Sequence, residues 1–379
     1  MAGLYIHIPF CSRKCGYCAF YSVVGLDHNI DRFLTALELE ARSRVSELTE
    51  PLNSIYIGGG TPSLLDSSRF ERLNQIIEDN FPLRATEMME YTIEVNPDDV
   101  EDRRIQAWYN AGVNRVSMGI QSMITGELKI IGRRHTSDEA IRAFWKLRRF
   151  FSNISLDIIF GLPSQTMESW IQSVEAVVSL APDHISAYSL TYEERTKFSR
   201  MLSAGEILAT DENICGDMFD WLCQKMAKEG YEHYEISNFA IPSKRSLHNS
   251  SYWNGSPYLG LGPSAASYDG YRTRRSNPPT LKGFLQYFTS PGENESYVHT
   301  EILSKMEIVE EYIMTRLRTV EGIDMRHYNL LFGENETSRL IDRAKRFGNE
   351  WVAMEEGCLR LTEKGFFISD EIIVALLPD

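Results

Sequence analysis

The chain has 379 residues, 43% hydrophobic and 24% charged, which excludes a disordered or fibrous protein and favours one large domain plus a smaller one. Acidic residues outnumber basic ones by 53 to 39, and the formal charge of −14 argues against nucleic acid as the main partner. No apolar run reaches the roughly 18 residues of a membrane helix, and the start lacks a signal-peptide core. These features predict a cytoplasmic protein with at most peripheral contact to a membrane.

Residues 1–192 alternate short β-type runs with amphipathic helical patterns, which is a repeated βα unit. The predicted strands are 4–8, 54–57, 91–95, 115–119, 155–160 and 184–190, and the predicted helices are 31–48, 70–80, 105–111, 138–150 and 167–180. Such units close as a doubly wound sheet or as a partial (β/α) barrel, and the pattern alone does not separate the two. Polar residues gather at the predicted carboxyl ends of the strands, where barrels carry their chemistry, and this favours the barrel.

Two further segments follow the βα units. Residues 193–298 are rich in Ser, Asn, Tyr, Gly and Pro, with one clear helix over 211–229, and predict an α+β elaboration packed on the barrel. Residues 299–379 predict a small winged-helix-like domain: helices over 305–318, 324–331 and 337–347, a hairpin of 351–355 and 358–361, and a final apolar helix. The acidic excess of this domain favours a structural or substrate-covering role over DNA binding.

Three of the six cysteines, Cys11, Cys15 and Cys18, form a CxxxCxxC cluster directly after the first predicted strand. Random placement of six cysteines gives this spacing only about 0.0015 times per chain, so the cluster is predicted to bind a metal group. Structural zinc takes four ligands, and the candidates for a fourth are His7, Cys215, Cys223 and Cys358. An iron–sulfur cube held by three thiolates instead leaves one iron open for chemistry.

The other cysteines have a different setting. Cys215 and Cys223 fall in the apolar helical pattern of 211–229, which predicts core cysteines rather than ligands.

A glycine-rich segment, Gly58-Gly59-Gly60-Thr61-Pro62, follows the second predicted strand. It lacks the lysine of a Walker A loop and the spacing of a dinucleotide-binding turn. Glycines let the backbone approach a ligand closely, so the segment is a candidate cofactor loop, with a simple tight turn as the alternative.

The three-cysteine spacing at the end of a first strand resembles the radical S-adenosylmethionine (radical SAM) enzymes. The resemblance implies a partial (β/α)6 TIM-like barrel, a 4Fe-4S cluster on Cys11, Cys15 and Cys18, and S-adenosylmethionine on the open iron, cleaved reductively to a 5′-deoxyadenosyl radical. The resemblance also implies an electron donor, such as flavodoxin or ferredoxin, that reduces the cluster. Segments spread over nearly the whole chain closely resemble the HemN/HemW family, the oxygen-independent coproporphyrinogen III oxidases and their haem-chaperone relatives: 5–11, 58–64, 114–122, 132–135, 157–163 and 234–240.

Carried over position by position, the resemblance also implies the residues around S-adenosylmethionine. They are Tyr5, Tyr17, Gly59, Gly60, Thr61, Glu94, Gln121, Arg133 and Asp157. Glu94 or Asp157 can accept hydrogen bonds from the ammonium group or the ribose hydroxyls, and Arg133 can pair with the carboxylate. Tyr17 is expected near the adenine. The alternative for each residue is a strand-end cap, a loop tether or ordinary packing.

Two departures from the oxidase pattern bear on activity. The oxidases carry a fourth cysteine two positions after the third, where this chain has Phe20, and an N-terminal extension, where only ten residues precede Cys11. Residues 248–253 and 258–263 resemble the haem-chaperone branch. The resemblance therefore favours a chaperone that delivers haem to apo-haemoproteins such as respiratory enzymes. A coproporphyrinogen III oxidase or another radical SAM enzyme of porphyrin biosynthesis is the alternative.

Haem needs an axial ligand, and His248 is the candidate because Tyr252 and Trp253 lie near it in the sequence. The alternative for His248 is a hydrogen-bonded structural histidine. Relatives commonly carry a histidine at the position of Ala266, so whatever that histidine does is missing here.

Overall fold

A computed structural model describes residues 2–48, 50–81, 89–290 and 297–378. Six parallel strands form its centre: β1 (Ala2–Ile8), β4 (Leu52–Gly59), β5 (Glu90–Val95), β6 (Arg115–Gln121), β7 (Ile154–Phe160) and β8 (His184–Ser189). These strands lie side by side in chain order. A doubly wound sheet reverses its strand order part-way across, so this arrangement is the partial barrel that the sequence favoured.

The sheet continues beyond both edges of the barrel to give twelve strands among the described residues. Beside β1 follow β11 (Tyr258–Leu261), β12 (Ala266–Tyr268), β13 (Thr273–Ser276) and β14 (His299–Ile302), and beside β8 follow β10 (Asn238–Ala240) and β9 (Glu232–Glu235). Only β11 of these added strands is parallel to its barrel neighbour. Strand β14 pairs with β13, so the large sheet extends into the segment predicted as the C-terminal domain.

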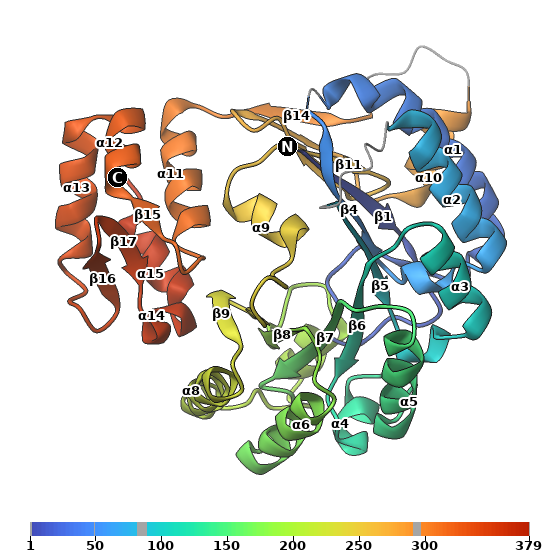
Figure 1. The fold of residues 1–379 in the computed structure, drawn as a ribbon, viewed down its shortest axis with the longest axis horizontal. Helices are drawn as coiled ribbons and strands as arrows, with labels where there is room; N and C mark the ends of the chain where they lie inside the picture. The colour runs from blue at the N-terminus through green and yellow to red at the C-terminus, as the bar shows by residue number, and fades with distance from the viewer. Residues whose placement is uncertain (1, 49, 82–88, 291–296, 379) are drawn as a thin grey trace.

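Helices cover the outer face of the barrel (Figure 1). They are α1 (Ile30–Arg44), α2 (Ser67–Asn80), α3 (Asp102–Asn110), α4 (Thr125–Ile130), α5 (Ser137–Arg148) and α6 (Met167–Ser179). The strand residues that face them are apolar at every second position, as Leu4, Ile6 and Ile8 show on β1, and are almost completely buried. This alternation follows from the pleat of a strand, which points successive side chains to opposite faces.

The inner face of the same strands is polar. It carries Tyr5, His7, Tyr56, Thr92, Glu94, Arg115, Ser117, Ser155, Asp157, His184 and Ser186. Barrel interiors are ordinarily filled by branched apolar side chains. A polar interior has to be satisfied by hydrogen bonds or by a bound group, and the functional site grows from this requirement.

The elaboration contains more helix than its sequence suggested. The predicted helix over 211–229 is confirmed as α8 (Glu212–Lys228), and three short helices join it: α7 (Lys197–Ser203), α9 (Leu247–Trp253) and α10 (Leu281–Thr289). Each short helix begins at a Ser or Thr whose side chain accepts a backbone hydrogen bond from the third helical residue. Such caps are readable in a sequence, but the helices are too short to show a clear apolar period.

The C-terminal region is winged-helix-like, as predicted. It runs through α11 (Lys305–Arg316), β15 (Ile323–Asp324), α12 (Met325–Phe332), α13 (Glu334–Ala344), β16 (Val352–Glu355), β17 (Cys358–Leu361), α14 (Glu363–Phe367) and α15 (Ser369–Leu376). The β16–β17 hairpin turns at Glu356 and Gly357, with φ of 50° and 82°, which is the left-handed pair that a two-residue hairpin turn requires. Figure 1 shows this region, in red, beside β9. In the described part of the chain no helix has both the length and the apolar character to cross a membrane.

Helix α9 is tied to the amino end of the barrel by a buried carboxylate. Glu90, at the start of β5, accepts hydrogen bonds from the Ser246 hydroxyl and from the backbone N–H groups of Leu247 and His248, at 2.9 to 3.1 Å. The guanidinium of Arg115, 1% exposed, lies 3.9 Å away. Glu90 therefore caps α9 and offsets the charge of Arg115 with one side chain.

We expect Glu90→Ala to lower the free energy of unfolding by about 3 kcal/mol, because it leaves a buried cation and three donors without a partner. Chemical denaturation followed by circular dichroism measures the loss. The matched control is Glu168→Ala at an exposed position on α6, where we expect a change within about 0.5 kcal/mol. Equal stability of the two variants would contradict this account of Glu90.

Candidate functional site

The cysteine cluster lies on a closed loop at the carboxyl end of β1. Strand β2 (Phe10–Cys11) pairs with β3 (Val23–Val24) and closes the loop at its base. Inside the loop, the N–H of Gly16 donates to the carbonyl of Ile131, and the N–H of Phe198 donates to the carbonyl of Gly16. A Cβ on Gly16 would lie 2.5 Å from the Phe198 ring, so only glycine fits this anchor. All three cysteines of the loop are free thiols.

The glycine-rich segment packs directly on the first cysteine. The N–H of Gly60 donates to the Ile8 carbonyl at 2.8 Å, and a Cβ on Gly60 would lie 3.1 Å from the Cys11 sulfur. The Thr61 hydroxyl donates to that sulfur at 3.3 Å. Gly59 has a φ of 111°, which favours glycine. The absence of side chains lets the β4 end run close beside the cluster loop, as the cofactor-loop interpretation expects.

Glu94, near the end of β5, is a buried carboxylate that makes no salt bridge with the described residues, although the charge of Arg115 acts on it. It accepts hydrogen bonds from the Tyr56 hydroxyl at 2.9 Å and the Gly59 N–H at 3.1 Å. Burial, reinforced by the nearby charge of Asp157, raises the pKa of Glu94 to about 7. A bound cation would restore the charged form, so the site is electrostatically suited to an ammonium group.

Arg133 also lies beside the cluster loop. Its guanidinium donates to the Asn96 side-chain oxygen at 2.8 Å and to the Gly119 carbonyl, and it lies 3.8 Å from the Cys15 sulfur. Tyr17 packs edge-on against Phe198 with ring centres 6.5 Å apart. A guanidinium in this position is able to pair with a carboxylate.

Two further predicted residues lie on the neighbouring strands: Gln121 at the end of β6 and Asp157 in the middle of β7. Gln121 has a φ of 73° at a register shift in β6, and this irregularity brings its side chain over Gly119. Asp157 accepts hydrogen bonds from the hydroxyls of Ser117 at 3.1 Å and Ser155 at 3.2 Å. Burial raises the pKa of Asp157, and these hydroxyls act in the opposite direction.

Comparison with known proteins identifies the family that uses such a site. Residues 5–177 match the model of the radical SAM superfamily, and residues 303–368 match that of the HemN C-terminal domain. The chain is 34% identical to the heme chaperone HemW of Lactococcus lactis over 99% of its length and 97% of that protein, and 32% identical to HemW of Bacillus subtilis over the full length of both. The chain belongs to the HemN/HemW family of the radical SAM superfamily.

A solved HemN structure confirms the fold. The coproporphyrinogen III oxidase HemN of Escherichia coli, 23% identical, superposes with a TM-score of 0.84 over 99% of this chain and 90% of that one. The likeness includes the partial barrel and the C-terminal domain, so the architecture is that of a HemN-type protein.

Membership of this family implies a 4Fe-4S cluster and S-adenosylmethionine, and the described residues fit both groups. Three thiols on one loop leave one iron of a cube without a protein ligand. Burial raises the pKa of Cys11, and that of Cys18 to about 11, so these two residues are thiols until iron replaces their protons. When bound, the cluster and S-adenosylmethionine together supply one-electron chemistry. Glu94 would hold the ammonium group and Arg133 the carboxylate.

The predicted cofactor residues divide into two groups in space. Gly59, Gly60, Thr61, Glu94, Tyr17, Gln121 and Arg133 lie around the cysteine loop through the contacts described above. Asp157 lies farther along the barrel interior, held by its serine neighbours, and Tyr5 contacts His7 and Tyr56 instead of the cysteines. The Tyr5 hydroxyl is within 3.0 Å of His7, and its ring stacks with Tyr56 at 6.2 Å between centres.

An aromatic cavity of about 360 Å³ opens beside the cysteine loop. Its walls are Tyr5, His7, Ala19, Phe20, Tyr21, Tyr252, Tyr258, Ser264 and Ala266. The wall includes Phe20 and Ala266, the two positions at which the sequence departs from the patterns expected of the oxidases and of the chaperone relatives. Phe20 is 69% exposed, so a large apolar side chain stands at the rim. Such exposure of an aromatic next to a cavity is typical of a ligand site.

His248 is buried behind this cavity and is only 1% exposed. One ring nitrogen lies 2.9 Å from the Ser54 hydroxyl and the other 2.9 Å from the Tyr252 hydroxyl. The ring also stacks on Tyr56 with centres 5.1 Å apart. As a haem ligand His248 would have to give up one of these hydrogen bonds, so the arrangement favours the structural alternative. Ligation of haem by His248 stays a prediction.

Sequence reasoning missed several residues of the site. Tyr56, Arg115, Ser117 and Ser155 lie on the inner face of the barrel and hold the predicted residues in place. Their signal was available, because polar residues alternate with Ile, Leu and Val along strands that are buried on both faces. In a barrel with an apolar interior, both faces of each parallel strand are buried, so the strand sequences are continuous apolar runs.

The raised pKa of Glu94 predicts a stability effect with a definite sign. The Glu94 carboxyl has a pKa of about 7 in the folded chain and 4.5 in the unfolded chain. The free energy of unfolding of the cofactor-free protein therefore falls as the pH rises from 4.5 to 7. The free energy of unfolding of Glu94→Gln minus that of the parent chain should therefore increase by roughly 2 kcal/mol when the pH rises from 5 to 8. Urea unfolding at the two pH values measures this. Glu101→Gln, at an exposed carboxylate, is the control, and a pH-independent difference for Glu94→Gln would contradict the assignment.

Proposed function

We propose that the chain is a haem chaperone that carries a 4Fe-4S cluster on Cys11, Cys15 and Cys18, binds S-adenosylmethionine beside it, and passes haem to apo-haemoproteins. Full-length similarity to two proteins named heme chaperone HemW supports this function. The single observation that carries the proposal is the aromatic cavity next to the cysteine loop.

The chemistry of the cavity suits a tetrapyrrole. A porphyrin is a broad, flat, largely apolar ring, and aromatic side chains offer it flat apolar faces and edges. Tyr252 and Tyr258 meet edge-to-face with centres 4.7 Å apart, and Phe20 and Tyr21 extend the aromatic wall toward the cluster loop. The exposed Phe20, Ser264 and Ala266 keep one side of the cavity accessible to solvent, so a cargo held there can leave toward a partner.

The alternative function is an oxygen-independent coproporphyrinogen III oxidase, or another radical SAM enzyme that acts on a tetrapyrrole. The intact cysteine cluster and the placement of Glu94 and Arg133 support a site capable of radical chemistry. Phe20 opposes the oxidase, because a phenyl ring cannot supply the thiol found at this position in the oxidase pattern. We therefore rank the chaperone first.

The proposed partners follow from this function. Apo-haemoproteins, such as respiratory enzymes, would accept the haem in the cytoplasm or at the membrane surface. Flavodoxin or ferredoxin would reduce the cluster if the cofactor is cleaved. We expect no nucleic-acid partner, because acidic side chains outnumber basic ones.

The deciding experiment compares haem binding with turnover on the same anaerobically reconstituted protein. We expect stoichiometric haem binding in an absorption titration, and no protoporphyrinogen from coproporphyrinogen III with S-adenosylmethionine and a strong reductant. Phe20→Ala should weaken haem binding by about threefold to tenfold, because it removes part of the aromatic wall. Trp145→Ala, at an exposed aromatic on α5, is the control and should bind haem like the parent chain. Decarboxylated product without tight haem binding would establish the oxidase instead.

A gain-of-function variant tests the position of the cargo. Ala266 lies in the cavity wall and is exposed, so Ala266→His adds an imidazole to the cavity without displacing a buried group. Imidazole is a strong axial ligand of haem iron. We expect Ala266→His to bind haem at least about tenfold more tightly and to show the spectrum of a histidine-ligated haem, whereas Ala266→Leu should not. Identical spectra for the two variants would place the haem outside the cavity.

A further inference from the structure

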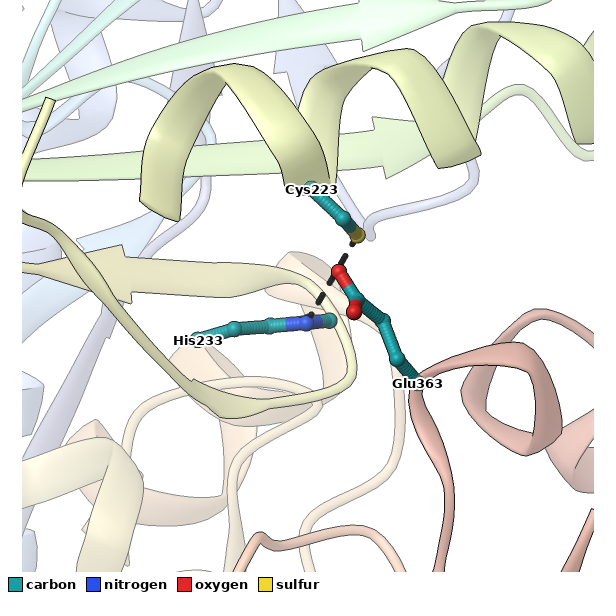
Figure 2. Close-up of side chains that lie close together, drawn as sticks. All are labelled: Cys223, His233 and Glu363. Carbon is teal, nitrogen blue, oxygen red and sulfur yellow. Dashed lines mark hydrogen bonds between the residues drawn. The ribbon is translucent and has the colours of Figure 1, made fainter. Parts of the chain in front are cut away.

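A second cluster of metal-binding side chains joins the barrel to the C-terminal domain. Cys223 lies in α8, His233 in β9, and Glu363 is the first residue of α14. One potential ligand atom from each of the three lies within 4.8 Å of the other two. Figure 2 shows the thiol, the imidazole and the carboxylate pointing toward one another from three separate elements. None of these elements carries the cysteine loop.

The imidazole of His233 is oriented for ligation. Its Nε2 lies 3.2 Å from the carbonyl oxygen of Ile236, which fixes the ring proton on Nε2 and leaves the lone pair of Nδ1 facing the Cys223 sulfur. The ring is stacked on Phe239 with centres 4.2 Å apart, and Phe366 closes a third side at 5.1 Å. A backbone carbonyl that holds the outer ring nitrogen is the arrangement found behind metal-ligating histidines.

The spacing of the donors matches zinc. With Zn–S of about 2.3 Å and Zn–N of about 2.0 to 2.1 Å, tetrahedral coordination sets sulfur and nitrogen about 3.5 Å apart. The Cys223 Sγ and His233 Nδ1 are 3.7 Å apart. Thiolate and imidazole donors select zinc and similar transition metals over magnesium or calcium, which prefer oxygen ligands. The carboxylate of Glu363, within 4.8 Å of both atoms, can supply the third ligand after a small movement of its exposed side chain.

We propose that Cys223, His233 and Glu363, with a water molecule as the fourth ligand, bind one zinc ion between the barrel and the C-terminal domain. Cys223 is 2% exposed, so the metal is shielded on the barrel side. Glu363 is exposed, so a water molecule can reach the fourth position. This function is separate from the radical SAM site. Cys223 is buried in the core, as its sequence setting predicts, and the proposal adds a ligand role to it. The helical pattern could not reveal the site, because the second ligand follows ten residues later and the third lies in another domain.

The test uses cobalt as a visible substitute for zinc in the full-length chain with Cys11, Cys15 and Cys18 replaced by alanine, so that cluster thiols do not compete. We expect one equivalent of cobalt to give a thiolate-to-metal charge-transfer band and one equivalent of zinc to remove it. Cys223→Ser should abolish the band, and Glu363→Gln should weaken cobalt binding by at least about tenfold. Cys215→Ser, two turns earlier on the same helix, is the matched control and should leave binding unchanged.

Two further readouts keep the proposal falsifiable if a variant folds poorly. Circular dichroism checks the fold of each variant, and Glu363→Gln changes an exposed residue that is not needed for the core. Zinc should raise the thermal midpoint of the background chain and not that of Glu363→Gln, because only the folded state offers the site. In the cluster-loaded parent chain, elemental analysis should find one zinc in addition to the cluster iron. A charge-transfer band that persists in Cys223→Ser, or no band and no thermal shift, would overturn the proposal.

Discussion

Charge buried inside a barrel costs free energy unless it finds a partner, and Arg115 shows how this chain meets that cost at one end of the sheet. Its guanidinium is neutralised by Glu90, and Glu90 in turn caps α9. The barrel therefore depends on the elaboration at this point, because α9 and its cap supply the hydrogen-bond donors for the buried carboxylate of Glu90. A barrel lined with Val and Ile would need no such helix.

At the other end of the barrel, Glu94 and Asp157 make no salt bridge with the described residues. Burial raises the pKa of each, although the charge of Arg115 opposes the rise. Arg133 lies 3.8 Å from the Cys15 sulfur and donates to Asn96, two residues after Glu94. Carboxylate and guanidinium groups therefore both border the cysteine loop, and they carry the charges opposite to those of an amino acid. The amino end of the barrel provides stability, and the carboxyl end keeps an electrostatic imbalance that a zwitterionic cofactor would remove.

Features that are formed by residues close together in the sequence could be predicted from the sequence. The apolar strand runs and the Glu356-Gly357 turn each depend on residues within a few positions of one another, and both predictions are confirmed in the fold. The CxxxCxxC spacing is equally local, and the metal group that it predicts stays a prediction. Contacts between distant segments were not predictable. Nothing near Cys223 indicates Glu363, and nothing near His248 indicates that Ser54 and Tyr252 occupy both of its ring nitrogens. Such relations come from the closure of the barrel and the docking of the C-terminal domain.

The same hydrogen bonds bear on how a proposed haem carrier would hold and release its cargo. Both ring nitrogens of His7 are also engaged, with the Tyr5 hydroxyl and the Tyr21 carbonyl. Burial raises the pKa of Tyr252 and Tyr258, so these side chains remain phenols and poor iron ligands. The cavity wall therefore offers haem aromatic contact but weak axial ligation. A cargo bound mainly through its flat face dissociates without breaking a strong metal–protein bond, and an acceptor with a free histidine can then take it. Weak axial ligation would therefore favour release of the cargo, and Ala266 adds no ligand to the cavity wall.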